Sequence, residues 1–356
     1  MPAYKDDKRG TWYCKFYYTD YEGNRRQKYK RGFALKREAE AWERDFLQNV
    51  SFQPDMTFSA FYDLYLKDVT PRLRAHTIQK KGYYAKNHLL PSFGEMRLNE
   101  ITALIIRQWQ NEMIEKGLAL KYIQNLQKEL SAIFNHAVRF YNLKQNPCRL
   151  AGQPIKADEQ KQPIRFWTLD EYSRVIDCID DIKARTAVSV LYWSGMRKGE
   201  LLALKWSRID FRGATVDICE SYQRLRGKAV ITPTKTGESR IIRLPDVCMQ
   251  QLIEYRKCIY DPAPDDFVFN WEKRFIETGI SQGSKAAGVK RIHVHGLRHS
   301  HASLLISLGV NIVLISKRLG HAKVSTTLDT YSHFFPDDEK TVIDQLDAVT
   351  QLQGQQ

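Results

Sequence analysis

The spacing of apolar residues changes along the chain and divides its 356 residues, too many for one ordinary domain, into separate units. Over 10–33, aromatic and polar side chains alternate on either side of a turn at 21–24, as they do in strands. Over 35–47, apolar residues recur at helical spacing instead. This stretch predicts a small domain over residues 1–50, with a three-stranded sheet plus one helix.

The second stretch, 56–150, has helical spacing throughout. Its apolar-periodic segments are interrupted where Pro or Gly breaks the pattern, for example at Pro91 with Gly94. The predicted helices are Phe58–Asp68, Arg74–Leu90, Ala103–Lys116 and Leu120–Tyr141. We therefore expect an all-helical domain here.

A polar, proline-bearing stretch at 151–165 predicts an interdomain linker. The pattern over 166–335 is mixed. Helices are expected around 169–180, 183–194, 246–260, 272–287, 296–308 and 311–319, and strands at 214–220, 228–232 and 239–245. The fold class is therefore multidomain and mainly α with small β-sheets, and the third unit is a mixed α+β domain. An apolar stripe in the last segment, 336–356, predicts a tail helix.

The charge balance points to a polyanionic partner. Lys and Arg number 55 and Asp and Glu 41, a net charge of +14, which most often indicates nucleic acid. Basic side chains gather on the second strand of the first unit and on helices of the second. The candidate DNA contacts are Arg25, Arg26, Lys28, Lys30, Arg72, Arg74, Lys80 and Lys81.

Several classes of protein are not expected. No apolar run approaches the ~20 residues of a membrane span, and the first 30 residues lack a signal-peptide core. Cysteines occur singly, so neither a zinc ribbon nor a disulfide framework is predicted, and a reducing cytoplasm fits best. No GxxxxGK[ST] or GxGxxG motif is present, so no nucleotide cofactor is expected.

Four short motifs in the third unit place polar residues beside apolar helices. Arg197 lies at a helix junction, with Glu200 three residues later; alone, such a pair is commonly a surface salt bridge. Lys235 lies between two strand-like runs, at the expected tip of a β-hairpin. A lysine there can be swung into a site by loop closure, although turn lysines are usually only solvated.

The third motif is the histidine-rich HVHGLRHSH at 293–301, in which His295 and Arg298 share a helix face. Zinc is an alternative, because His295 and His299 have i,i+4 spacing, but no acidic ligand or HExxH pattern supports it. The fourth motif ends a helix at a glycine and places His321 on the next turn, ten residues before Tyr331.

Together these motifs offer two arginines, a lysine and two histidines as donors without a paired carboxylate. Such a set can hold a phosphodiester and the extra charge of its transition state. A tyrosine is the natural nucleophile for it, forming a covalent phosphotyrosine. No metal or other cofactor is expected, because side chains supply the cations.

The order of these motifs resembles that of the tyrosine recombinases, in particular the integrases of phages and conjugative transposons. The resemblance implies that Arg197 and Arg298 grip the scissile phosphate and that Tyr331 forms a 3′-phosphotyrosyl link. It also implies further hydrogen bonds from His295 and His321, with His295 a candidate to take the tyrosine proton, and protonation of the departing 5′-hydroxyl by Lys235. Glu200 is expected only to support its neighbours.

The resemblance also implies the roles of the units. Residues 1–50 resemble an arm-type DNA-binding domain and 56–150 a core-binding domain that closes with the catalytic domain, 166–335, around a duplex. The implied function is integration and excision of a mobile element through a Holliday junction, without ATP. The implied partners are double-stranded DNA at core-type and arm-type sites, further copies in a tetramer, and an accessory DNA-bending or excision protein, in the cytoplasm of a bacterial host.

Two other hypotheses remain. One is a non-catalytic DNA-binding regulator or architectural protein, which would not need Tyr331. The other is a metal-dependent nuclease built on the histidine cluster. The tail, 336–356, is expected to dock in trans on a neighbouring protomer, the alternative being packing on its own domain.

Overall fold

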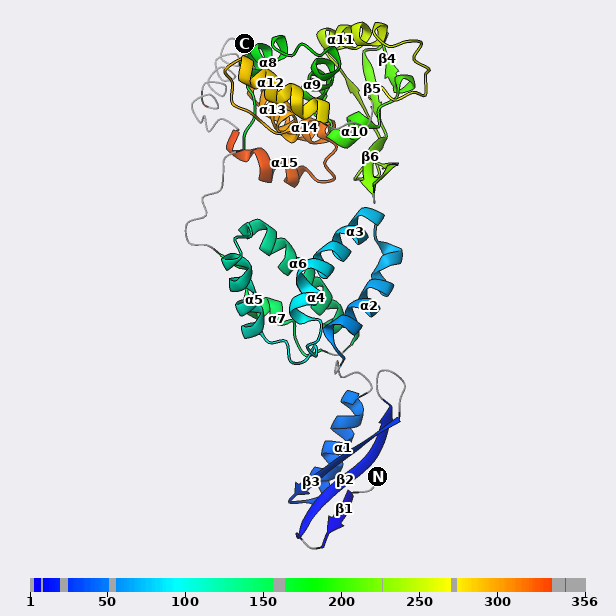
Figure 1. Cartoon of the computed structure of the whole chain (residues 1–356), viewed down its shortest axis with the longest axis vertical. Helices are drawn as coiled ribbons and strands as arrows, with labels where there is room; N and C mark the ends of the chain where they lie inside the picture. Colours follow the sequence, from blue (N-terminus) through cyan, green and yellow to red (C-terminus); the bar gives the residue numbers. More distant parts are fainter. Residues whose placement is uncertain are drawn as a thin grey trace, which may run out of the picture. The chain divides into compact units, whose positions relative to one another are not determined.

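The computed structural model divides into two compact units, Met1–Gln160 and Lys161–Gln356 (Figure 1). Both are mainly helical, with small antiparallel sheets. The structure describes residues 3–7, 9–19, 25–50, 56–141, 143–155, 164–225, 227–269, 274–334 and 343.

The first unit begins with a three-stranded antiparallel sheet covered by one helix. Phe16, on the middle strand, is buried against Trp42 and Phe46 of the helix, whereas the third strand is exposed along almost its whole length. The sheet therefore presents a basic strand to solvent. The elements are β1 (Ala3–Asp6), β2 (Thr11–Thr19), β3 (Arg25–Phe33) and α1 (Lys36–Val50).

A helical domain follows in the same unit. Its core is built from aromatic and aliphatic side chains that recur at helical spacing, among them Phe58, Phe61 and Phe134. The elements are α2 (Phe58–Val69), a 3₁₀ turn (Thr70–Arg72), α3 (Ala75–Tyr84), a π-helical turn (Ala85–Leu89), α4 (Leu90–Phe93), α5 (Ala103–Glu115), α6 (Leu120–Phe140) and α7 (Pro147–Ala151).

The helix break expected at Pro91 is wrong. Helical backbone continues to Phe93, and Pro91 lies in the first turn of α4, directly after the π-helical turn. The π turn shifts the hydrogen-bond ladder just before the proline, with the N–H of Leu90 bonded to the carbonyl oxygen of Ala85, and Pro91 itself has no N–H to donate. The π turn thus lets a proline sit inside a continuous helical segment.

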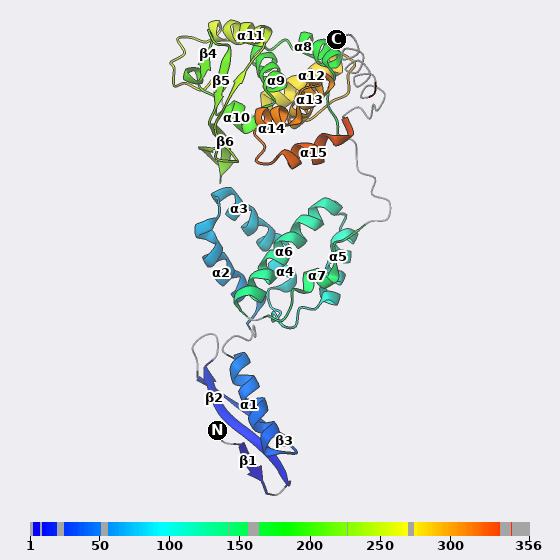
Figure 2. The same cartoon turned by 180° about the vertical axis from the view of Figure 1, so that it is seen from behind.

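The second unit surrounds a central helix, α9 (Ile182–Ser194), which packs against α11, α12 and α13 (Figures 1 and 2). Buried residues lie all round α9, as expected for a helix in a core. The other helices are α8 (Leu169–Asp177), α10 (Lys198–Leu202), α11 (Asp246–Lys257), α12 (Arg274–Ala286), α13 (Val294–Ser307), α14 (Ile312–Leu319) and α15 (Val324–Tyr331), with 3₁₀ turns at Trp206–Arg208 and Ser332–Phe334.

Two small sheets flank these helices. One has the strand order β4-β5-β8 and the other pairs β6 with β7. Because β8 pairs with β5 and not with β7, Lys235 lies in the turn that links the two sheets, and its expected place at a hairpin tip is wrong. The strands are β4 (Ile209–Asp210), β5 (Thr215–Ile218), β6 (Glu220–Leu225), β7 (Lys228–Pro233) and β8 (Arg240–Arg243).

Two of the expected segments fall wholly or partly outside the described residues. The tail helix expected over 336–356 lies outside the described residues, apart from Ile343, whose side chain is exposed. Part of the expected linker, 156–163, is likewise outside them. Among the described residues, no helix combines the length and the apolar character that a membrane crossing requires.

Candidate active site

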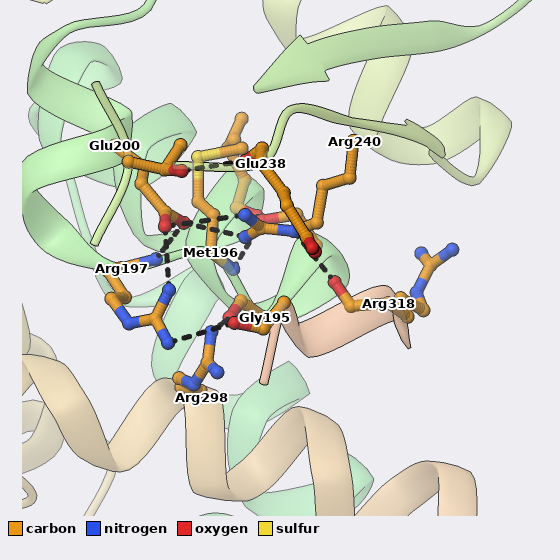
Figure 3. A network of polar contacts seen from close by, with 12 residues as sticks. Gly195, Met196, Arg197, Glu200, Glu238, Arg240, Arg298 and Arg318 are labelled. Atoms are coloured by element: carbon orange, nitrogen blue, oxygen red, sulfur yellow. Dashed lines mark hydrogen bonds and ion pairs between the residues drawn. The ribbon is translucent and has the colours of Figure 1, made fainter. Parts of the chain in front are cut away.

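Two arginines of the second unit are held by the carbonyl groups at the ends of two helices. Arg298 Nη1 donates to the carbonyl oxygen of Gly195 at 2.8 Å (Figure 3). Arg197 Nη2 donates to that of Gly320 at 3.2 Å. The two glycines end α9 and α14 in the left-handed region, with φ of 64° and 67°. Since helix C-termini carry partial negative charge, both carbonyls attract a guanidinium.

Glu200 joins Arg197 to a second guanidinium. Its Oε1 accepts from Arg197 Nη1 at 2.9 Å, and its Oε2 accepts from Arg240 Nη2 at 2.6 Å (Figure 3). The carboxylate side chain is only 1% exposed. Burial alone would raise the pKa of Glu200, but hydrogen bonds and charge from Arg240 and Arg197 hold it below its ordinary value. Glu200 is therefore an ionised support for both arginines.

Sequence reasoning did not select Arg240, although it lies in the expected strand that follows Lys235. It is the first residue of β8, and its Nε donates to the carbonyl oxygen of Arg318 at 3.0 Å. Its guanidinium also lies under Gly320, where an added Cβ would meet Nη1 at 2.9 Å. Arg240 thus ties the sheet to the end of α14. The one available signal was its place on a short basic strand, which does not distinguish it from solvated arginines.

Arg298 has a donor that the described residues leave unused. The residue is 2% exposed, and its Nη2 is buried without a hydrogen-bond partner in the described part of the chain. Burial, then the positive charge of Arg197, lowers the pKa of Arg298 to about 9. The unsatisfied donor and the buried positive charge each cost free energy. An anion placed at Nη2 would accept the hydrogen bond and neutralise the charge.

Two histidines and a lysine surround these cations. His295 is exposed at the start of α13, and desolvation of its ring, then the charges of Arg298, Arg197 and Lys235, lowers its pKa. Lys235 is exposed in its turn, and its charge is among those that disfavour protonation of His295. His321 is fixed by a hydrogen bond of 2.8 Å to Thr327, and burial, then Arg298, lowers its pKa to about 4.

Tyr331 ends α15 and is 1% exposed. Its ring packs in a small core with Ile306, Ile315 and Leu319 from α13 and α14. Burial raises the pKa of Tyr331 to about 12, while the charge of Arg298 acts in the opposite direction. The phenol is therefore protonated at neutral pH, and it lies within electrostatic reach of the buried arginine. Hydrogen bonds and charge interactions thus link the six candidate catalytic residues within the second unit.

The hydroxyl of Tyr331 is hydrogen-bonded to a histidine that sequence reasoning assigned to the zinc alternative. His299 Nδ1 lies 2.9 Å from Tyr331 Oη. The His295 and His299 rings contact each other edge-on, with centroids 4.9 Å apart. Among the described residues, no group of three or more His, Cys, Asp or Glu side chains is placed to hold a metal ion.

The candidate DNA contacts differ in their exposure. The candidates on β3 are exposed, and Lys30 also lies over the Trp42 ring at 4.8 Å. Arg72, Arg74 and Lys80 are exposed as well. Lys81 is not presented to a duplex, because its ammonium pairs with Glu129 at 2.6 Å and is only 12% exposed.

Models of three families match the chain. They are the phage integrase family over residues 165–337, the N-terminal SAM-like domain of phage integrases over 57–114, and an arm DNA-binding domain over 2–50. The ICEBs1 integrase of Bacillus subtilis (strain 168) is 28% identical over 309 residues, covering 82% of this chain and 83% of the relative. A tyrosine recombinase of Thermosipho africanus (strain TCF52B) is 32% identical over 232 residues, covering 63% of this chain and 73% of the relative.

Solved structures share the fold. The Tn1549 transposon integrase in complex with transposon right end DNA gives a TM-score of 0.68 at 20% identity, covering 82% of this chain and 100% of that one. The lambda integrase tetramer bound to a Holliday junction gives 0.60 at 18% identity, covering 95% of both chains. The second comparison extends the likeness of fold to nearly the whole length of both chains.

Proposed function

The chain belongs to the tyrosine recombinases of the phage integrase family, and from this membership we propose that it is the integrase of a bacterial mobile element. Its activity is site-specific cleavage and rejoining of DNA strands. The single observation that carries the assignment to this site is Arg298, a buried guanidinium with one unpartnered Nη2 beside a buried tyrosine. The ICEBs1 relative favours an integrative element as the source of the chain.

The scissile phosphate is proposed to occupy the position at Arg298 Nη2. One non-bridging oxygen accepts from this donor, and Arg197, held by Glu200 and Gly320, reaches another. The two cations also take up the extra negative charge that develops on the oxygens in the transition state. His295 and His321 supply further hydrogen bonds.

Cleavage then follows as a substitution at phosphorus. Tyr331 Oη gives up its proton to a neighbouring histidine as it forms a bond to phosphorus, the bond from phosphorus to the 5′ oxygen breaks, and Lys235 donates a proton to that oxygen. A 5′-hydroxyl of a second duplex can attack the 3′-phosphotyrosyl link in the same way. Two such rounds pass through a Holliday junction. Each step exchanges one phosphoester for another, so the reaction consumes no ATP.

The other domains are proposed to bring DNA to this site. The exposed basic strand β3 suits contacts with phosphates at arm-type sites, and the helical domain, with exposed Arg72 and Lys80, suits core-type sites. Strand exchange between two duplexes requires several copies of the chain, and we propose a tetramer in the synaptic complex. Binding of two kinds of site by one chain favours bent DNA, and hence an accessory bending or excision protein. The proposed location is the bacterial cytoplasm.

A suicide substrate tests this function. The duplex carries the end-to-end junction of the element that encodes the chain, with nicks near the candidate cleavage positions so that cleaved ends diffuse away. We expect a covalent protein–DNA adduct in the presence of EDTA. A regulator would form no adduct, and a metal-dependent nuclease would release free ends and stop in EDTA; either result would overturn the proposal.

A further inference from the structure

The hydroxyl of the proposed nucleophile is held by one imidazole. Tyr331 Oη lies 2.9 Å from His299 Nδ1, and no other hydrogen bond to this hydroxyl is found within the described residues. The rings approach at 63°, with centroids 5.5 Å apart. Neither of the two histidines expected to contact the phosphate, His295 and His321, is hydrogen-bonded to this oxygen.

His299 connects the buried phenol to an open cavity. The histidine lines a cavity of about 580 Å³, which is also lined by His295, Gly296, Arg165 and Arg291. Tyr331, by contrast, is enclosed in the core formed by α13, α14 and α15. The imidazole is thus the side chain through which a proton can pass between the phenol and the cavity.

Resting on the function proposed above, we propose that His299 is a catalytic residue that accepts the phenolic proton of Tyr331 through Nδ1 during strand cleavage. The bond from Tyr331 Oη to hydrogen breaks as Oη bonds to phosphorus. The electron pair of the broken phosphoester stays on the 5′ oxygen, which takes a proton from Lys235. His299 is left as an imidazolium, and it returns the proton to the phenol when the phosphotyrosyl link is attacked.

The positive charges around His299 disfavour proton transfer from Tyr331 while no DNA is bound. Burial, then the charges of His295 and Arg298 on α13, lowers the pKa of His299 to about 4, so the free imidazole is neutral. Arg165 and Arg291 face the same cavity and add positive charge. A phosphodiester seated on Arg298 brings negative charge to this cluster, which stabilises the imidazolium and makes the proton transfer easier.

The rival explanation is that His299 only orients Tyr331. Asparagine separates the two roles, because its Oδ1 can accept a hydrogen bond near the position of Nδ1 but cannot take up a proton. If His299 only orients the phenol, His299→Asn keeps the rate. If His299 is the base, the variant has a lower cleavage rate, and the size of the decrease depends on the acidity of the phenol.

The experiment measures the rate of adduct formation on the nicked junction duplex described above. We expect His299→Asn and His299→Ala to lose about 10²- to 10⁴-fold at neutral pH, with a rate that rises more steeply with pH than in the wild type. Replacing Tyr331 by a fluorinated tyrosine, whose phenol is more acidic, should restore His299→Asn by a larger factor than it changes the wild type. Melting curves and gel shifts verify that the variants fold and bind the duplex.

A matched control exists in the other unit. His88 Nε2 makes the same kind of bond, 2.9 Å, to Tyr122. His88→Ala should cost a similar hydrogen bond without lowering the rate per bound protein. The proposal is overturned if His299→Asn cleaves at the wild-type rate, if the fluorinated tyrosine does not rescue it selectively, or if His88→Ala slows cleavage equally. If the wild-type chain forms no adduct, the proposed function fails, and this inference fails with it.

Discussion

Arg240 Nη2 lies 2.6 Å from Glu200 Oε2, in a pair whose side chains are 12% and 1% exposed. A second contact of 3.3 Å, from Arg240 Nη1 to Oε1, makes the pair bidentate. The same carboxylate holds Arg197, so one buried acid sets the positions of two guanidinium groups. Loss of the Glu200 carboxylate should therefore affect both the stability of the unit and the proposed phosphate site.

Glu200→Gln should therefore destabilise the catalytic unit and abolish cleavage. A neutral amide leaves the largely buried Arg240 and the half-buried Arg197 without their carboxylate, at a cost of about 3–5 kcal/mol. Denaturant unfolding measures the cost. Glu200→Gln combined with Arg240→Met should lose less than the sum of the two single variants, because they share one interaction. Additive losses would contradict the pairing.

Tyr331→Phe should bind the junction duplex like the wild type and form no covalent adduct. The ring still packs against Ile315 and Leu319, so the free energy of unfolding should change by only about 1 kcal/mol, the value of one hydrogen bond. Gel shifts and denaturing gels provide the two readouts. Any remaining adduct would place the nucleophile elsewhere.

Arg298→Lys should lower the cleavage rate by about 10²–10³-fold. A single ammonium cannot reach both the Gly195 carbonyl and the phosphate, whereas the planar guanidinium presents separate donors to them. The matched control is Arg208→Lys, an exposed arginine paired with Asp217, which should cleave at the wild-type rate. Equal decreases of the cleavage rate in the two variants would argue against a phosphate site at Arg298.

Lys235→Ala should slow cleavage of ordinary DNA much more than cleavage of DNA with sulfur at the 5′ bridging position. A thiolate leaves without being protonated, so it does not need the acid that the lysine is proposed to supply. The ratio of the two rates, compared with the wild-type ratio, is the measurement. An unchanged ratio would assign the acid to another side chain.

The catalytic unit should lose stability as the pH falls from 6.5 toward 4. The folded protein holds the pKa of His301 at about 3 and those of His299 and His321 at about 4, against 6.5 for an ordinary histidine. Burial is the largest cause in all three. In this range the unfolded chain binds more protons than the folded one, so protonation favours unfolding.

Melting temperatures measured from pH 8 to pH 4.5 test this dependence. His301→Gln should flatten the curve, because a glutamine oxygen can accept from Arg318 Nε, as His301 Nε2 does at 2.9 Å, without titrating. A melting temperature independent of pH in this range would show that these histidines are not buried in the neutral form.

Local sequence patterns predicted much of the fold. The alternation over Arg25–Phe33 coincides with β3, and the helix expected from 169 begins at Leu169, behind a capping box formed by Thr168 and Glu171. These elements depend on neighbouring residues, so their signals are local. The helix that continues past Pro91 was missed because a π turn leaves no mark in the apolar spacing.

The motifs of the candidate site could be predicted from the sequence, but the strand pairing and hydrogen bonds between them could not. Lys235 was misplaced because strand pairing is a long-range choice: β8 could follow β7 in a hairpin, yet Ile242 pairs with Val216 of β5. His299 and Arg240 were missed for a related reason. Their partners, Tyr331 and Glu200, lie 32 and 40 residues away, and no spacing rule reaches that far.

The two helix ends that hold Arg298 and Arg197 have a consequence for anyone who would transplant this centre into another scaffold. The anchors are main-chain oxygens, so copying the reactive side chains alone would not reproduce them. The graft has to include both helix termini with their glycines, since at Gly195 an added Cβ would lie 2.6 Å from the His301 ring. What must be conserved in such a design is a backbone trajectory.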